Sequence, residues 1–456
     1  MKCCLALLLA CLPALAQLSA SDRAAIDDAA RKTLAETGDV SASIAIVKDG
    51  RIAYVQACGD ARLDPPTPAR PDMLYKIGSN TKQFVSTSVL LLAEQGRISL
   101  DDPVSRYLPD LTRGNEVTIR NLLSHTSGYQ DYYPLDYVAP FMFRPTSLQN
   151  IVDIWAKKPL DFDPGTEWQY SNTNYTIAGL IIEKLSGQTL FEFMRIHIFV
   201  PLGMHTPIDA DHEKWNDSWP VGYQRAALGP QRPARIEGIG WLNAAGELAM
   251  TAGDLARWDI ALMNGTLLKP GSLRALTKEM DLKNGEHTGY ALGLGVSNAN
   301  GRRRWAHNGG TAGFTSFNVT RPDDRVAVAV LTNSESGASG KLGRQIEQMI
   351  TARSDSQESA ALERVKQIFN SLEQGRLDRT LLDSDANSYF TDQVIADYAA
   401  SVKPLGTPDS LVQTASEERG GMTWRGYTIH GAGKSLRLST FFTPDGKVAQ
   451  YLIYPQ

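Results

Sequence analysis

A serine and a lysine three positions apart are the residues of this sequence best suited to covalent chemistry. Ser79 and Lys82 are followed by apolar residues at helical spacing, and Gly96 is the predicted end of that helix. Residues three apart share a helix face, so the Lys82 amine can approach the Ser79 hydroxyl. The backbone N–H groups and positive dipole at a helix start also stabilise charge formed during acyl transfer. The pair predicts a nucleophile and a general base, provided that burial or another cation lowers the pKa of the amine.

A second polar group, Tyr170-Ser171-Asn172, follows the turn signal Pro164-Gly165 and precedes an apolar run that starts at Ile177. This pattern predicts a turn that leads into a helix, where side chains can project into a cleft. A tyrosine beside a lysine can relay protons in a serine hydrolase. The alternative is a buried tyrosine whose hydroxyl only satisfies a neighbouring polar group.

Strand patterns at both ends of this region predict how the polar groups are held together. Apolar runs at 42–47 and 51–58 flank Asp49-Gly50, a strong hairpin signal. Residues 305–317 read as one strand, with glycines where another backbone or a ligand approaches closely. The run 326–332 supplies a neighbouring central strand. With helices between them, these strands predict one mixed α/β (α+β) domain whose sheet joins the N- and C-terminal parts.

Two irregular segments are candidates for shaping a binding site. Residues 122–143 form a predicted loop rich in Tyr and Phe, which suits either the wall of a substrate pocket or a satellite hydrophobic cluster. Residues 211–240, rich in Trp, Pro, Gly and Arg, predict an excursion over the cleft. Further along, Thr251 or Asp254 is the expected cap of the helix that follows.

Three motifs taken together, Ser79-Asn80-Thr81-Lys82, Tyr170-Ser171-Asn172 and His307-Asn308-Gly309, resemble those of the serine β-lactamase and penicillin-binding protein superfamily. The similarity is greatest to the branch of class C β-lactamases, family VIII esterases, D-alanyl-D-alanine carboxypeptidases and D-aminopeptidases. It covers roughly residues 22–350. The resemblance implies a β-lactamase/transpeptidase-like fold, with a central antiparallel sheet flanked by helices.

The resemblance also implies catalytic roles. Ser79 would be the acylated nucleophile, Lys82 its general base, and Tyr170 the group that protonates the leaving group and activates water. The oxyanion hole would use the backbone N–H groups of Ser79 and Gly310, and losing one such donor typically costs about 3 kcal/mol.

The same resemblance assigns substrate binding to Asn172, His307, Gly309 and Gly310. His307 is a departure, because β-lactamases commonly have a lysine at that position. A permanent cation suits a substrate carboxylate, whereas a histidine is only partly charged at neutral pH. The substitution favours an esterase or a peptidase acting on D-amino-acid peptides over an antibiotic hydrolase.

Composition excludes several other classes of protein. The chain has 456 residues, 42% hydrophobic content and a net charge of −4, without a basic run, so we expect binding to neither nucleic acid nor an anionic membrane. No run after the N-terminus is long and apolar enough to span a bilayer. The sequence lacks an H-E-x-x-H motif and Cys-paired spacings, so we expect neither a metal nor another cofactor. We expect the other histidines to be structural or exposed: His125, His197, His205, His212, His287 and His430.

The first 16 residues predict a secretory signal peptide, because one basic residue precedes an apolar core and an Ala14-x-Ala16 exit. Lipidation at Cys11 is a second possibility. We therefore expect an exported protein, periplasmic or secreted. Cleavage after Ala16 would leave Cys58 alone, so no intramolecular disulfide is expected.

The C-terminal part predicts a separate small domain. Residues 351–359 are polar and small, which is typical of a linker. Residues 360–456 predict a small α+β accessory domain, with a helix at 361–373 and strands at 422–430, 435–442 and 447–454. This segment resembles the small cone-shaped accessory domains of the NTF2-like group, much more weakly than the first domain resembles its superfamily.

Two hypotheses follow for the whole chain. The first is an exported serine hydrolase that forms an acyl-enzyme on Ser79 with a small-molecule ester, a β-lactam or a D-amino-acid peptide, including peptidoglycan-derived ones. The second is a non-catalytic peptidoglycan-binding or sensor protein that keeps the fold. The complete set Ser79, Lys82 and Tyr170 favours the enzyme. Nothing in the sequence indicates an oligomeric state.

Overall fold

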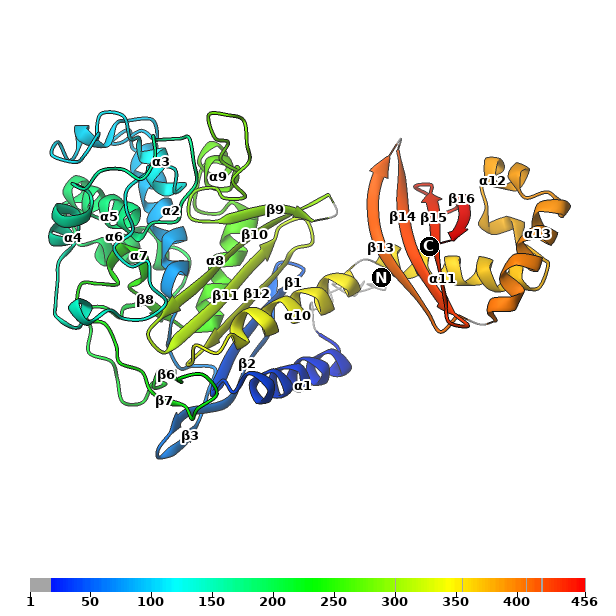
Figure 1. The fold of residues 1–456 in the computed structure, drawn as a ribbon, viewed down its shortest axis with the longest axis horizontal. Helices are drawn as coiled ribbons and strands as arrows, with labels where there is room; N and C mark the ends of the chain where they lie inside the picture. Colours follow the sequence, from blue (N-terminus) through cyan, green and yellow to red (C-terminus); the bar gives the residue numbers. More distant parts are fainter. Residues whose placement is uncertain (1–17, 300, 355, 407, 420, 456) are drawn as a thin grey trace, which may run out of the picture. The chain divides into compact units, whose positions relative to one another are not determined.

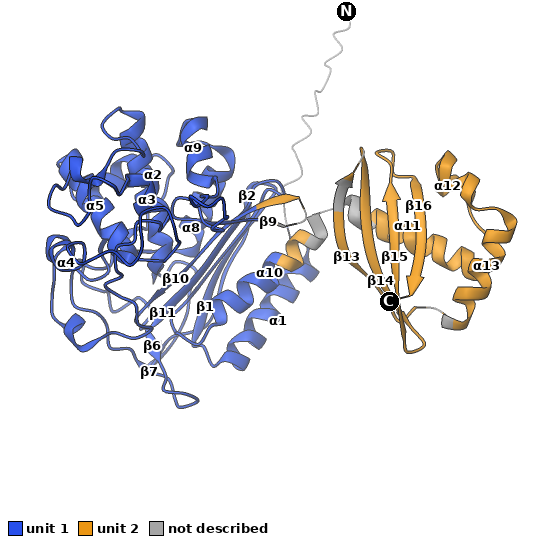
Figure 2. Ribbon diagram, turned by 45° about the horizontal axis from the view of Figure 1, so that its top comes forward, with its two compact units in different colours: residues 1–297, 304–347 blue, residues 298–303, 348–456 orange. Residues whose placement is uncertain are grey.

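A computed structural model describes residues 18–299, 301–354, 356–406, 408–419 and 421–455. The predicted signal peptide, residues 1–16, lies outside the described residues. The chain divides into two compact units, which Figure 2 shows in different colours. The first comprises Met1–Ser297 and Arg304–Glu347, and the second comprises Asn298–Arg303 and Gln348–Gln456.

The first unit is built on a seven-stranded sheet with the strand order β3-β2-β1-β12-β11-β10-β9 (Figure 1). In chain order its strands are β1 (Ser41–Lys48), β2 (Arg51–Leu63), β3 (Pro66–Pro68), β9 (Gly295–Ala299), β10 (Arg302–Thr311), β11 (Phe314–Arg321) and β12 (Val326–Thr332). Smaller sheets join β4 (Tyr75–Lys76), β8 (Leu248–Met250) and β5 (Ile208–Asp209), and pair β6 (Tyr223–Gln224) with β7 (Arg232–Pro233).

The predicted hairpin and central strand are confirmed. Asp49 and Gly50 connect β1 and β2 with positive φ angles of 51° and 73°, which a two-residue hairpin turn requires. β1 lies antiparallel beside β12, with Ile44 opposite Val330. The sheet therefore joins the N- and C-terminal parts of this unit, as predicted, and every residue of β12 is buried.

The prediction of a single strand over 305–317 is wrong. The chain turns at Ala312-Gly313, and β10 and β11 form an antiparallel hairpin in which Thr311 pairs with Phe314. Gly313 has a φ of 79°, a conformation that glycine adopts without a steric penalty. In the sequence, Gly309 and Gly310 come just before the turn, so Gly313 alone does not mark where one strand ends and the next begins.

Helices cover both faces of the sheet (Figure 1). On β11, Asn318 donates to Asp259 of α8 (Ala252–Asn264), whereas the neighbouring Phe317 lies against Gly343 of α10 (Ala338–Ser354). Successive strand residues point to opposite faces, so α8 and α10 lie on opposite sides. The N-terminal helix α1 (Ala20–Thr37) lies beside α10, where Glu36 and Lys341 form an ion pair at 2.5 Å.

A helical region packs beside the sheet with α2 (Thr81–Glu94) at its centre. This region also contains α3 (Ile119–Leu123), α4 (Leu148–Trp155), α5 (Asn172–Ser186), α6 (Leu190–Met194), α7 (Asn243–Gly246) and α9 (Pro270–Thr277). Shorter turns are η1 (Gly78–Asn80), η2 (Val104–Arg106), η3 (Pro140–Phe143) and the π-helical η4 (Arg195–Phe199). Most residues of α2 are buried. Its Phe84 packs on Trp258 of α8 at 4.7 Å between ring centroids. The helix that begins at the Ser79 motif thus forms part of the core.

The second unit is a four-stranded antiparallel sheet with helices. Its strands are β13 (Ser410–Arg419), β14 (Met422–Gly431), β15 (Lys434–Phe442) and β16 (Val448–Pro455), in that order. Its helices are α11 (Ser356–Glu373), α12 (Ser384–Tyr389) and α13 (Asp392–Val402), with short turns η5 (Arg379–Leu381) and η6 (Lys403–Leu405). The three strands expected from the sequence correspond to β14, β15 and β16. The likeness to NTF2-like domains stays a prediction.

The segment at 351–359 differs from the predicted linker. The backbone of α10 continues to Ser354, and α11 begins at Ser356, on either side of residue 355. Ala, Arg, Gln and Glu in this segment are good helix formers, so its polar composition is also compatible with helix. Within the described part of the chain, no helix has the length and apolar content needed to cross a membrane.

Candidate active site

Ser79 lies in the single turn η1, which leads directly into α2. The preceding strand β4 fixes this entry, because Tyr75 pairs with Met250 of β8. Gly78 then takes a φ of 53°, so the chain turns sharply just before the serine. Ser79 is half-buried and lines a cavity.

The Lys82 amine lies 3.0 Å from the Ser79 hydroxyl and is fully buried. It also donates to the side-chain oxygen of Asn172 at 2.9 Å and to the backbone oxygen of Ala245 at 2.7 Å. Burial lowers the pKa of Lys82 to about 7, and the nearby Asp131 opposes that fall. A neutral amine has two hydrogens and one lone pair. Two carbonyl oxygens can therefore occupy the hydrogens, which leaves the lone pair for the Ser79 proton.

Asn172 is oriented by a residue that the sequence analysis did not identify, Asp131. The Asp131 carboxylate accepts the Asn172 backbone N–H at 3.0 Å and its side-chain amide at 3.2 Å. This arrangement turns the Asn172 carbonyl oxygen towards Lys82 and begins α5 at Asn172, five residues before the apolar run. Asp131 lies in the aromatic loop, and burial raises the pKa of its carboxyl.

Tyr170 lies over the amine, with its ring centroid 4.9 Å from Lys82 Nζ. The ring of His125 packs on Tyr170 at 4.3 Å between centroids, and the Ser171 N–H donates to His125 Nδ1 at 3.2 Å. Burial lowers the pKa of His125 and keeps it neutral, so its place is structural, as expected. Burial raises the pKa of the Tyr170 phenol, while a hydrogen bond with Ser79 opposes that rise. Tyr170 is therefore protonated at neutral pH and able to donate a proton.

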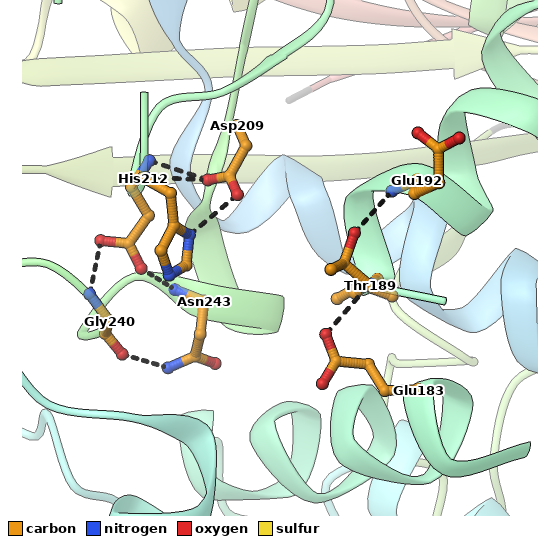
Figure 3. Close-up of polar contacts among 9 residues, drawn as sticks. Glu183, Thr189, Glu192, Asp209, His212, Gly240 and Asn243 are labelled. Carbon is orange, nitrogen blue, oxygen red and sulfur yellow. Dashed lines mark hydrogen bonds and ion pairs between the residues drawn. The ribbon is translucent and has the colours of Figure 1, made fainter. Parts of the chain in front are cut away.

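The turn that precedes the Ala245 carbonyl is held by hydrogen bonds, and Figure 3 shows those around Gly240 and Asn243. The Asp211 carboxylate accepts the backbone N–H of Gly240 at 3.1 Å and that of Asn243 at 2.8 Å. The Asn243 amide donates back to the Gly240 carbonyl at 3.2 Å, and its oxygen accepts the Thr176 hydroxyl at 2.9 Å. The Ala245 carbonyl, which accepts a hydrogen bond from Lys82, is thus positioned by α5 and by the segment that ends the 211–240 excursion.

The glycines of β10 allow the strand to lie against the Ser79 turn. A Cβ on Gly309 would collide with the Ile77 carbonyl, and a Cβ on Gly78 would lie 2.7 Å from Gly310 N. A Cβ on Gly310, in contrast, would meet no atom within 4 Å, and Gly310 lines the cavity. Gly309 therefore allows the backbone at Ile77 to approach β10 closely, whereas Gly310 borders open space.

The register of the hairpin sets the direction of the Gly310 N–H. Hydrogen-bonded and non-hydrogen-bonded pairs alternate in an antiparallel ladder. The pair Thr311–Phe314 closes the two-residue turn, so Gly310–Thr315 is a non-hydrogen-bonded pair. The Gly310 N–H consequently points away from β11. Together with the N–H of Ser79 it can form an oxyanion hole.

His307 does not line the cavity. Its Nδ1 lies 2.6 Å from the Asn308 carbonyl and carries the hydrogen, so Nε2 accepts the Tyr290 hydroxyl at 2.8 Å. Burial lowers the pKa of His307 to about 4, and the proximity of Lys82 contributes to that fall. His307 is therefore neutral and saturated by protein partners, and it supplies no cation for a substrate carboxylate.

The cavity has a volume of about 420 Å³. Among the predicted site residues, Ser79, Asn172 and Gly310 line it, whereas Lys82, Tyr170, His307 and Gly309 are not among its lining residues. Both interpretations of the aromatic loop hold. Tyr132 packs in a satellite cluster with Trp241 and also lines the cavity, as do Tyr133 and Tyr137. Within the described ranges, no group of three His, Cys, Asp or Glu side chains is arranged to hold a metal ion.

Comparison with known proteins identifies the family of this fold and site. The family model described as Beta-lactamase matches residues 26–349. The chain belongs to the β-lactamase family. Its members of known activity include hydrolases that use a serine nucleophile, and this β-lactamase-family chain is a serine hydrolase of the same group.

The relatives of the chain include penicillin-binding proteins and amidases. Penicillin-binding protein 4* of Bacillus subtilis is 28% identical over 319 residues, which is 67% of this chain and 70% of that protein. The structure of D-amino acid amidase from Ochrobactrum anthropi is 26% identical, with a TM-score of 0.63 over 73% of this chain and 97% of that one. An octameric penicillin-binding protein homologue from Pyrococcus abyssi, 18% identical, shares the fold over 95% of this chain and 99% of its own, with a TM-score of 0.64.

Proposed function

We propose that the protein is an exported hydrolase that cleaves esters or amides of D-amino acids through an acyl-enzyme on Ser79. The observation that carries this proposal is the fully buried Lys82 amine 3.0 Å from the Ser79 hydroxyl, with a pKa of about 7. A base with a pKa near the working pH transfers protons most effectively.

Acylation begins when Ser79 Oγ attacks the substrate carbonyl and its proton passes to Lys82 Nζ. The N–H groups of Ser79 and Gly310 hold the oxyanion. The Tyr170 phenol donates a proton to the leaving amine or alcohol, and Lys82 returns its proton to the phenolate. Asn172 keeps the Lys82 amine in place throughout these transfers.

Deacylation repeats these transfers with water as the nucleophile. Tyr170 and Lys82 remove a proton from the water as it attacks the ester carbonyl. The bond between that carbonyl and Ser79 Oγ breaks, and the proton returns to Oγ. The product acid leaves, and the serine, lysine and tyrosine regain their starting protonation states.

Two observations favour D-amino-acid esters and amides over β-lactams. The neutral His307 supplies no fixed cation for the carboxylate that β-lactam antibiotics carry. The similarity to a D-amino acid amidase supports an amide or ester of a D-amino acid as the substrate.

The test compares the mature protein with its Ser79→Ala variant on p-nitrophenyl butyrate, D-phenylalanine amide and a fluorescent penicillin. We expect Ser79-dependent release of nitrophenol and ammonia, and at most slow turnover of the penicillin. Fast penicillin turnover would favour β-lactamase chemistry instead. Equal background rates for both proteins on every substrate would argue against a hydrolase and favour the ligand-binding or sensor function.

Export is proposed from the sequence of residues 1–16. Expression of the full chain in a bacterial host, followed by N-terminal sequencing of the periplasmic fraction, should give a chain that starts at Gln17. If the N-terminal residue is instead a lipid-modified Cys11, and Cys11→Ser abolishes the modification, the protein is anchored to the membrane by its lipid. An uncleaved protein in the cytoplasm would refute export.

A further inference from the structure

An acidic side chain, Glu335, faces the same cavity as Ser79. It follows β12 after two residues, and its carboxylate accepts the backbone N–H of Gly313 in the hairpin turn. Glu335 remains exposed to solvent at this position. Although part of the side chain is exposed, partial loss of water around its carboxyl and the nearby charge of Glu237 raise the pKa of Glu335, while the hydrogen bond from Gly313 opposes that rise. A carboxylate that is repelled by a second one gains from the arrival of a cation.

The second carboxylate, Glu237, lies directly behind the cavity wall. One of its oxygens accepts the Tyr133 hydroxyl at 3.0 Å and the Ala312 N–H at 3.1 Å, and both of these donors belong to residues that line the cavity. Its other oxygen is buried without a hydrogen-bond partner among the described residues, although only 8% of Glu237 is exposed. Lys76 interacts electrostatically with Glu237, but it does not line the cavity and burial lowers its pKa.

The described residues of the cavity wall include no compensating cation. Among the described residues that line it, none is Lys or Arg, whereas Glu335 and Asp136 are both acidic. The buried hydroxyl of Thr311, also on the wall, lacks a hydrogen-bond partner in the described structure and can accept a further donor. An acidic wall with unused acceptors suits a ligand that carries N–H donors and positive charge.

We infer that the cavity selects substrates that carry an ammonium group, and that Glu335 is the side chain that receives it. The inference rests on the proposed hydrolase function and narrows it to esters and amides of amino acids or peptides with a free amino group. Substrates with a carboxylate in the same place would be repelled. A hydrogen bond between the ammonium group and the carboxylate gives about a tenfold preference, which corresponds to about 1.4 kcal/mol.

The test uses three chromogenic substrates with the same scissile anilide and a different charge at the amino end: D-phenylalanine p-nitroanilide, its N-acetyl form and its N-succinyl form. The first carries an ammonium, the second is neutral and the third carries a carboxylate. For each one, kcat/KM is measured with wild-type protein, Glu335→Gln and Glu335→Asp. Glu286→Gln is the matched control, because it removes an exposed acid that does not line the cavity. The glutamine oxygen can still accept the Gly313 N–H.

The wild-type protein should prefer the ammonium substrate over the neutral one about tenfold and should be slowest on the succinyl form. Glu335→Gln should lower the ammonium-to-neutral ratio about tenfold, Glu335→Asp should keep most of it, and Glu286→Gln should not change it. Because the ratio compares two substrates on one preparation, it does not depend on the fraction of correctly folded variant.

A neutral fluorophosphonate distinguishes failure of this inference from failure of the proposed function. Labelling of Ser79 together with a preference for the neutral or anionic substrate would overturn the inference alone. An unchanged ratio in Glu335→Gln, or labelled enzyme that cleaves none of the three substrates, would do the same. Absence of both labelling and Ser79-dependent turnover would refute the hydrolase function and the inference with it.

Discussion

The protonation state of Lys82 gives the sharpest quantitative prediction. An exposed lysine has roughly one neutral amine in 2,500 at pH 7. Burial lowers the pKa of Lys82 to about 7, so about half of the molecules have a neutral amine at that pH. Burial thus raises the population of the active base roughly a thousandfold. If Lys82 is the base, acylation should rise with pH through about 7 and level off above it, a change of about tenfold between pH 6 and pH 8.

The assay is the stopped-flow burst of nitrophenol from p-nitrophenyl butyrate between pH 5.5 and pH 9, with the Ser79→Ala rate subtracted at each pH. Lys82→Arg is the matched variant, because arginine keeps its charge and cannot accept the proton. We expect that variant to lose at least about a hundredfold in acylation at every pH. A burst rate that is flat across this range, or that still rises steeply at pH 9, would refute Lys82 as the base.

The same shift in pKa has a consequence for stability. The native state releases the Lys82 proton near pH 7 and the unfolded state releases it near 10.5, so the unfolded chain binds more protons between these values. The contribution of Lys82 to the free energy of unfolding should therefore increase as the pH rises through this window, by up to about 5 kcal/mol. Denaturant titrations of wild type and Lys82→Met at pH 7 and pH 9 measure it, and equal pH dependence in both proteins would contradict the buried, neutral amine.

Two further predictions concern the residues that hold the site together. Asp131→Asn should slow acylation by up to about 100-fold. The rise of the acylation rate with pH should also move to lower pH, because a neighbour that favours the charged form of Lys82 is lost. Stopped-flow pH profiles measure both effects, and an unchanged midpoint of the rise would argue against the interaction between Asp131 and Lys82. Gly309→Ala should destabilise the fold by about 2 kcal/mol or more, whereas Gly310→Ala should change the free energy of unfolding by less than about 0.5 kcal/mol, because only the first Cβ meets backbone. Equal unfolding midpoints for the two glycine variants would show that β10 does not lie closely against the backbone at Ile77.

Local patterns in the sequence were sufficient where the physical cause is local. The spacing of Ser79 and Lys82 predicts their contact because a helix turn brings them together. The run 326–332 predicts β12 because a strand buried on both faces reads as continuous apolar sequence. The hairpin at Asp49-Gly50 follows from a turn that needs two residues at positive φ.

The missed features depend on contacts between distant segments. Asp131 acts on Asn172 from a loop 41 residues earlier, and no spacing rule connects a loop carboxylate to a helix start. The Ala312-Gly313 turn is hidden because Gly309 and Gly310 precede it, so Gly313 does not stand out as the one turn signal. His307 was expected to face the substrate, but Tyr290 and the Asn308 carbonyl occupy both of its ring nitrogens, which only the packed hairpin reveals.

The central claim is that Ser79 becomes covalently acylated. The most direct measurement is peptide mapping by mass spectrometry after rapid acid quenching of the protein with p-nitrophenyl butyrate, in wild type and in Tyr170→Phe, where slower deacylation should allow the intermediate to accumulate. The account predicts a butyryl group on the peptide that contains Ser79, at a stoichiometry near one in the variant, and none in Ser79→Ala. An acyl group on another residue, or turnover without any adduct at Ser79, would contradict it.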